Sequence, residues 1–171
     1  MTKRRPPRTR RPMTKEMLLP LPAAAARRKS IGHHMAYHTL ATGEGSGSIV
    51  AQLFSAVYGA YFVHEATEGR TNLDLFRVAE AALHDCAVRG KAEGKFTTTT
   101  DGMIAIRKIL ILRDEQLLNS PSYVLADAQA RRTAFLTNDL LSPIAPNASL
   151  RFARHLSVNF CQAEPYFSDF S

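Results

Sequence analysis

The chain has no tryptophan, only two cysteines among 171 residues, and no apolar run long enough to cross a bilayer. Cys86 and Cys161 lie far apart and belong to no CxxC pair, so the sequence indicates neither a disulfide framework nor a zinc knuckle. A membrane-spanning helix requires about 20 consecutive apolar residues, and no segment approaches that length. We therefore exclude an integral membrane protein and expect a soluble protein of the cytoplasm.

Motifs for catalysis and cofactor binding are missing as well. The sequence contains no HExxH and no Cys/His cluster. The glycine-rich segment 43–48 follows no predicted strand, so it forms no nucleophile elbow. It also lacks the lysine of a P-loop and places Glu44 where a phosphate would be repelled. The sequence thus predicts a protein that is not an enzyme and has no cofactor.

His34 and His38 give a weak indication of a metal site. They are four residues apart, a spacing that places both side chains on one face of a helix. A third ligand would have to come from His64, or from Glu80 and His84. Such pairs arise by chance in helices, so we expect no metal and interpret these histidines as packing or surface residues.

The surplus positive charge lies in residues 1–29, here called the N-terminal basic segment. This segment has ten basic residues and one acidic residue, a net charge of +9, whereas residues 30–171 have 12 basic and 14 acidic residues. A concentrated positive segment attracts polyanions irrespective of their sequence. We predict that its basic residues bind nucleic acid: Lys3, Arg4, Arg5, Arg8, Arg10, Arg11, Lys15, Arg27, Arg28 and Lys29.

The composition of the basic segment, rich in proline and charge, is typical of a disordered chain. Guanidinium groups separated by prolines stay extended and can reach successive phosphates or enter a minor groove. No aromatic residue is interleaved, so base stacking on single strands is not indicated. Two alternatives are a merely solubilising terminus and a twin-arginine export signal at Arg10-Arg11; Pro20 and Pro22 in the following apolar stretch count against the second.

Residues 30–144 show the apolar periodicity of helices. We predict an all-α bundle of four to five helices: 31–40, 48–67, Asn72 to Gly90, 103–118 and 120–136. The last four of these helices form the core. The predicted N-caps are Ser30, Ser48, Asn72, Asp101 and Ser120. Residues 109–112 alone also fit a buried strand, and Cys86 is expected in the core. For residues 145–171 we expect a poorly ordered tail with at most one short helix, near 150–160.

Four segments carry a resemblance to a known family: Met17 to Ala23, Ala56 to Phe62, Phe76 to Leu83 and Ile109 to Leu117. Over residues 13–144 the chain resembles a group of small proteobacterial proteins often labelled Fis-family transcriptional regulators. The resemblance implies a helical, dimeric, DNA-binding regulator. It assigns no recognition residue, because we find no helix-turn-helix in the two long helices predicted within 103–136.

The sequence therefore favours a DNA-binding accessory or regulatory protein that contacts phosphates through its basic segment. The alternative is a helical interaction or dimerisation module with no direct nucleic-acid role. In that module an exposed face of the helix at 48–67 or 103–118 would bind a second copy or another protein.

Overall fold

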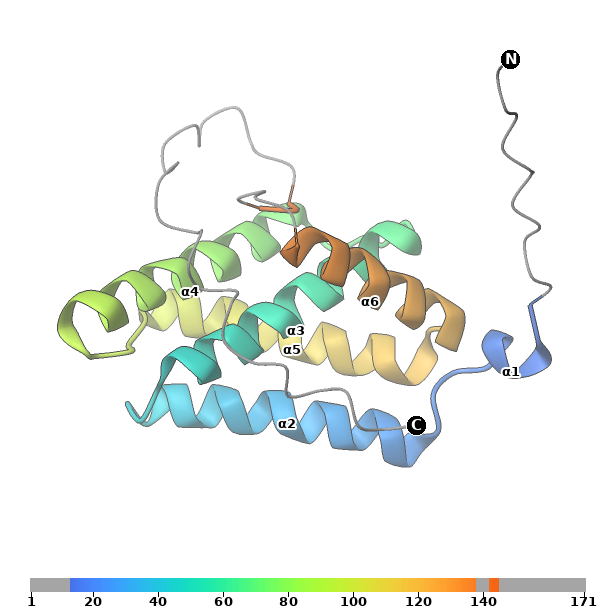
Figure 1. The fold of residues 1–171 in the computed structure, drawn as a ribbon, viewed down its shortest axis with the longest axis horizontal. Helices are drawn as coiled ribbons and strands as arrows, with labels where there is room; N and C mark the ends of the chain where they lie inside the picture. Colours follow the sequence, from blue (N-terminus) through green and yellow to red (C-terminus); the bar gives the residue numbers. More distant parts are fainter. Residues whose placement is uncertain (1–12, 138–141, 145–171) are drawn as a thin grey trace, which may run out of the picture.

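The computed structural model describes residues 13–137 and 142–144, which contain six helices and no strand (Figure 1). The all-α prediction is confirmed, although the helix count is six rather than four to five. The helices are α1 (Lys15–Leu18), α2 (Ala23–Ala41), α3 (Gly47–Ala66), α4 (Leu73–Glu93), α5 (Thr100–Asn119) and α6 (Ser122–Leu136). The predictions for residues 1–12 and 145–171 lie outside the described residues.

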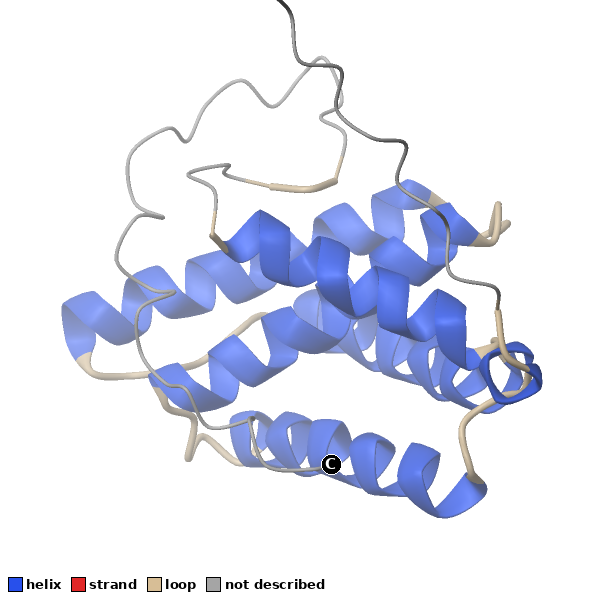
Figure 2. Cartoon of the chain, turned by 45° about the vertical axis from the view of Figure 1, so that its right-hand side comes forward, coloured by secondary structure: helices blue, strands red, loops and turns tan. Residues whose placement is uncertain are grey.

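Helix α3 lies at the centre of the bundle. All nine residues from Ala56 to His64 are buried, so this part of α3 has no solvent face. Helices α2, α4, α5 and α6 all pack against it, as the two views of the ribbon show (Figures 1 and 2). Fully buried Leu53, Phe76 and Leu117 fill the spaces between the helices, and each such side chain contributes about 1.5–3 kcal/mol to folding.

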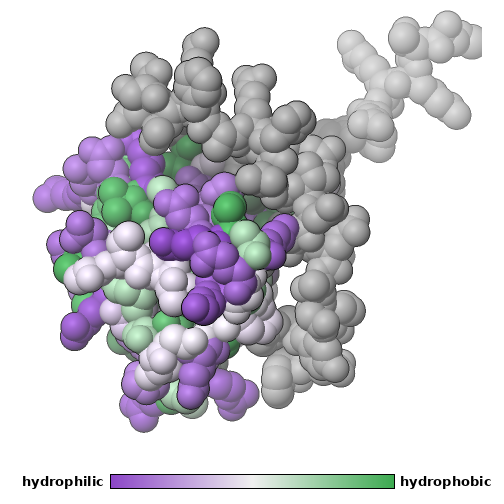
Figure 3. Space-filling model, turned by 90° about the vertical axis from the view of Figure 1, so that its left-hand side faces the viewer, coloured by the Kyte–Doolittle hydropathy of each residue, from purple (hydrophilic) through white to green (hydrophobic). Residues whose placement is uncertain are grey.

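The surface at one end of the bundle is mainly hydrophilic. Viewed from the left-hand side of Figure 1, hydrophobic residues are scattered singly among polar ones (Figure 3). Single exposed apolar residues of this kind are ordinary on the surface of a folded domain.

Two predicted N-caps are wrong by two residues, and one is confirmed. Asn72 caps α4 as expected, and its side chain accepts a hydrogen bond from the backbone N–H of Asp74 at 2.9 Å. Helix α3 is capped by Ser46, which accepts from the N–H of Ile49 at 3.4 Å. In the two cases that are wrong by two residues, α3 and α5, an earlier hydroxyl takes the capping role, since several candidate caps follow one another in the sequence.

The cap of α5 follows the same pattern. Thr99, not Asp101, accepts a hydrogen bond from the N–H of Gly102, at 3.1 Å, so Asp101 lies in the first turn. An acidic residue there interacts favourably with the helix dipole. At the start of α6, Ser120 is not the cap; Pro121 occupies that position without a side-chain cap.

The predicted start of the first large helix at Ser30 is wrong, because α2 begins at Ala23 and includes Ser30 in its interior. Four consecutive alanines, 23–26, have the highest helix propensity, and they continue the helix into Arg27. The preceding chain is attached to α6: the Ser122 hydroxyl donates to the carbonyls of Glu16 and Met17, both at 3.1 Å. Residues 15–29 therefore belong to the folded body.

The predicted helix end at Gly90 is also wrong. Helix α4 continues to Glu93 and ends at Gly94, whose positive φ of 71° is the left-handed conformation that glycine favours. Gly90 instead allows a close approach, since a Cβ at this position would lie 2.2 Å from the ring of Phe96. This glycine serves packing and not helix termination.

We predict opposite effects for two helical Gly→Ala substitutions. Gly90→Ala is expected to lower the free energy of unfolding by about 1–3 kcal/mol, because the added methyl overlaps Phe96. The matched Gly32→Ala meets only the flexible end of Gln52 at 3.4 Å and is expected to raise stability by about 0.5–1 kcal/mol. Urea unfolding measures both; equal effects would contradict the packing role of Gly90.

Candidate functional site

Six of the ten predicted nucleic-acid-binding residues, Lys3, Arg4, Arg5, Arg8, Arg10 and Arg11, lie outside the described residues. The other four lie on helices: Lys15 on α1 and Arg27, Arg28 and Lys29 on α2. The fold therefore fixes the backbone positions of these four residues.

Lys29 belongs to a cationic cluster that the sequence did not predict. The cluster consists of Lys29 and His33 of α2, Arg113 of α5 and Arg132 of α6, which interact electrostatically with one another. Lys29 is exposed at its rim, while the other three side chains are half-buried. Three helices thus bring positive groups to one place.

Backbone carbonyls of α3 hold the two guanidinium groups. Arg113 Nη1 donates to the carbonyl of Gly59 and Arg132 Nη1 donates to that of Ser55, both at 3.3 Å. These carbonyls are four residues apart, about one helical turn. Gly59 leaves room for the approach, since a Cβ there would lie 3.3 Å from Arg113 Nη2. The two arginines therefore lie along the same face of α3.

Helix α2 is fixed beside this face. Gln52 Nε2 of α3 donates to the carbonyl of Gly32 at 3.2 Å, and His34 Nε2 lies 2.7 Å from Asp114 Oδ2 of α5. These two contacts flank His33 in the sequence. They position α2 so that Lys29 and His33 lie near both arginines.

The electrostatics of the cluster disfavour the charged forms. Burial and the nearby charge of Arg132 lower the pKa of Arg113 to about 10, although the charge of Asp114 opposes this shift. Burial lowers the pKa of Arg132, and burial followed by the charges of Arg113 and Arg132 lowers that of Lys29. The cations thus lie close enough to repel one another in a poorly solvated environment.

Polar atoms of the cluster lack partners. Nε of Arg113, Nε of Arg132 and Nδ1 of His33 are buried and form no hydrogen bond within the described ranges. No carboxylate of the described residues forms an ion pair with either arginine. Asp114 is nearby, but it is shared with His34. The cluster therefore has an excess of positive charge and unused donors, which are the features that bind an oxyanion such as phosphate.

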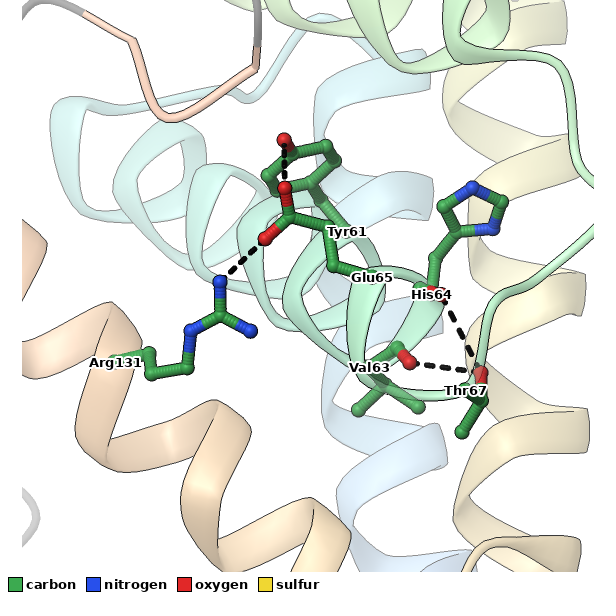
Figure 4. Close-up of polar contacts among 6 residues, drawn as sticks. All are labelled: Tyr61, Val63, His64, Glu65, Thr67 and Arg131. Carbon is green, nitrogen blue, oxygen red and sulfur yellow. Dashed lines mark hydrogen bonds and ion pairs between the residues drawn. The ribbon is translucent and has the colours of Figure 1, made fainter.

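The adjacent Arg131 provides a contrast. It forms an ion pair with Glu65, whose other carboxylate oxygen accepts a hydrogen bond from the Tyr61 hydroxyl at 2.6 Å (Figure 4). Its guanidinium also lies 5.0 Å from the ring centre of Phe62, a cation–π contact. Arg131 is thus neutralised, and of the two neighbouring arginines only Arg132 contributes unpaired charge.

Three of the residues considered as metal ligands, His34, His64 and Glu80, have other contacts. His34 pairs with Asp114, and the ring of His64 packs against Phe76 at 5.3 Å. Glu80 accepts hydrogen bonds from Tyr58 and Ser142, each at 2.9 Å. Within 13–137 and 142–144, no three His, Cys, Asp or Glu side chains come together to hold a metal ion.

Cys86 is a core residue, as its place on the apolar face predicts. Its side chain is fully buried, and burial raises the pKa of the thiol, so the reactive thiolate is disfavoured. In the glycine-rich segment, Ser46 caps α3, while Glu44 is exposed. Neither feature forms a catalytic arrangement.

Arg113 is the functional candidate that sequence reasoning missed. It follows the apolar run 109–112 inside the helix predicted at 103–118, and no sequence pattern assigns it a functional role. The available indication was Gly59, a glycine inside a strongly apolar helix, which is typical of a close approach by another group. The identity of that group depends on how α5 packs against α3.

No protein-family model, curated protein or solved structure matches this chain. The resemblance to proteins labelled Fis-family regulators therefore stays a prediction. Among the helices of the described residues, none is long and apolar enough to cross a membrane.

We predict that His33 makes stability depend on pH. Burial and the charge of Arg113 lower its pKa from 6.5 to about 4, although Asp114 opposes the shift and Lys29 and Arg132 add to it. The unfolded chain therefore takes up a proton first as the pH falls. Stability is expected to decrease between about pH 6.5 and 4, by up to roughly 3 kcal/mol.

Urea unfolding of the wild type and of His33→Gln at pH 7.5, 5.5 and 4.5 checks this dependence. Since other groups titrate in the same range, the difference between the two proteins isolates His33. The stability advantage of the wild type should shrink toward low pH. A difference that stays constant with pH would contradict the role assigned to His33.

Proposed function

We propose that the protein binds duplex nucleic acid through its N-terminal basic segment, with a backbone phosphate seated in the cationic cluster. The observation that carries the proposal is the unpaired positive charge of Lys29, Arg113 and Arg132 on the folded body. Lys29 belongs to both the basic segment and the cluster, and it follows Arg27 and Arg28 on α2.

Phosphate geometry suits the cluster. A guanidinium presents two parallel N–H donors to two phosphate oxygens, and the Nε–H groups of Arg113 and Arg132 are unused. A bound phosphate would also relieve the repulsion between the cations. Helix α2 holds Arg27 and Arg28 next to Lys29 in the sequence, which supports contacts to further phosphates along a strand.

Binding of this kind is expected to depend little on base sequence. The groups involved contact phosphates, and phosphate contacts carry no direct sequence information. An accessory or regulatory role on DNA agrees with this property and with the resemblance described above. Specificity, if the protein has it, would have to come from DNA shape or a partner protein.

A helical interaction module is the second candidate function. The central helix α3 offers no exposed apolar face over residues 56–64, which removes one of the two surfaces considered from the sequence. Helix α5 does expose apolar side chains.

Salt-dependent binding to duplex DNA tests the proposed function. In one full-length variant, the six basic residues within 1–12 become glutamine; in a second, Arg113 and Arg132 do. Each phosphate contact contributes about 0.9 to the slope of log affinity against log salt. We expect the slope to decrease by up to about 5 in the first variant and by up to about 2 in the second.

The matched control replaces Arg70 and Lys95, two exposed cations outside the basic segment and the cluster, with glutamine. Circular dichroism confirms that each variant is folded. The control should bind like the wild type within a factor of about two to three. If the Arg113 and Arg132 variant had the same DNA affinity and salt dependence as the control, binding of a phosphate in the cluster would be contradicted. If the variant of residues 1–12 had the affinity of the wild type, binding through the basic segment would be contradicted.

A further inference from the structure

Helix α5 exposes a line of large apolar side chains, here called the α5 stripe: Ile104, Ile111 and Leu118. Their exposed fractions are 48%, 49% and 53%. They are seven residues apart, almost two helical turns, so they lie along one side of the helix. Side chains of this type are usually buried, and their regular spacing distinguishes the stripe from scattered exposure.

The stripe faces away from the bundle. Helix α5 packs against α2, α3 and α4 on its other sides. At its N-terminal end, Ile104 lines a shallow recess of about 350 Å³ together with Leu75 and Val78 of α4. Val78 is itself 46% exposed, so the apolar surface extends beyond α5.

The charged residues beside the stripe have a particular order. Arg107 and Lys108 lie between the first two apolar residues, and Asp114 and Glu115 lie between the last two. The positive pair and the negative pair are therefore placed symmetrically about Ile111. This order makes the helix face complementary to itself in an antiparallel pair.

We propose that the α5 stripe binds the same stripe of a second copy, with the two helices antiparallel and Ile111 on the two-fold axis. In that arrangement Ile104 lies opposite Leu118 of the other copy, and Ile111 lies opposite itself. Lys108 and Glu115 are seven residues apart and share the α4 side of the stripe, so Lys108 then faces Glu115 of the other copy. Arg107 faces Asp114, which also pairs with His34 of its own α2. Each apolar residue of the stripe meets an apolar residue, and the exposed Lys108 meets the exposed Glu115 twice across the axis.

The alternatives fit less well. A parallel pair in register would place like charges opposite one another, which disfavours association. A different protein would not require a pattern symmetric about Ile111, whereas a two-fold dimer requires the same surface on both subunits. The recess beside Ile104 is also present at the position where Leu118 of the second copy arrives.

The expected dimer is of moderate affinity. The stretch from Ile104 to Leu118 spans about 21 Å at 1.5 Å per residue, so the contact is small compared with the roughly 800 Å² per subunit of a standard stable interface. Association is therefore expected at micromolar concentrations. The pairing does not depend on nucleic-acid binding.

Sedimentation equilibrium of the full-length protein tests the pairing. The wild type should be dimeric at high micromolar concentration, and Ile111→Lys, which places two ammonium groups at the axis, should weaken the dimer at least tenfold. Leu136→Lys on α6, another exposed apolar position, is the matched control and should leave the dimer unchanged. A wild type that is monomeric throughout this range would overturn the proposal.

Charge reversal tests the register. Lys108→Glu and Glu115→Lys alone each place like charges opposite one another and should weaken the dimer, whereas the double variant should recover it. A mixture of the two single variants should form a heterodimer. Both positions of the test lie on the surface, and thermal unfolding confirms folding. A double variant as weak as the single ones would contradict the antiparallel register.

Discussion

The complete burial of α3 over residues 56–64 is the constraint on which the other features of the bundle depend. A helix with no solvent face must be covered on all sides, and α2, α4, α5 and α6 provide that cover. Where the α3 surface is small, at Ser55 and Gly59, arginines of α5 and α6 reach its backbone carbonyls. The core thus determines where the cationic cluster forms.

The half-buried cations of the cluster lower the stability of the fold, and they are not needed to fill the core. Half-buried guanidinium groups that lack ion pairs lose hydration and repel each other, and apolar residues of similar size would fold more favourably. Arg131, next to Arg132 on α6, is neutralised instead by the carboxylate of Glu65 and the ring of Phe62, both on α3. Lowered pKa values of poorly solvated cations are typical of binding sites, which supports a role for the cluster in holding an anion.

Much of the fold follows from local sequence, and the cluster does not. Apolar periodicity predicted the large helices, and Asn72 was identified correctly as a cap. The start of α2 was missed because the basic, proline-containing composition of residues 1–29 outweighed the helix propensity of 23–26. Gly90 was misinterpreted because its function, contact with Phe96, exists only after folding. Lys29, Arg113 and Arg132 lie on three helices, so no spacing in the sequence relates them. The positive charge attributed to residues 1–29 in fact continues onto the folded body.

The central claim is that Arg113 and Arg132 contact an anion, and NMR of their side chains tests it most directly. The Nε–H resonances of the full-length, ¹⁵N-labelled protein can be followed while a short DNA duplex is added at low salt. Both resonances should shift as the duplex binds and return when salt is raised, because the contact is electrostatic. If the duplex bound and shifted other residues while both arginine resonances stayed in place, the account of the cationic cluster would be contradicted.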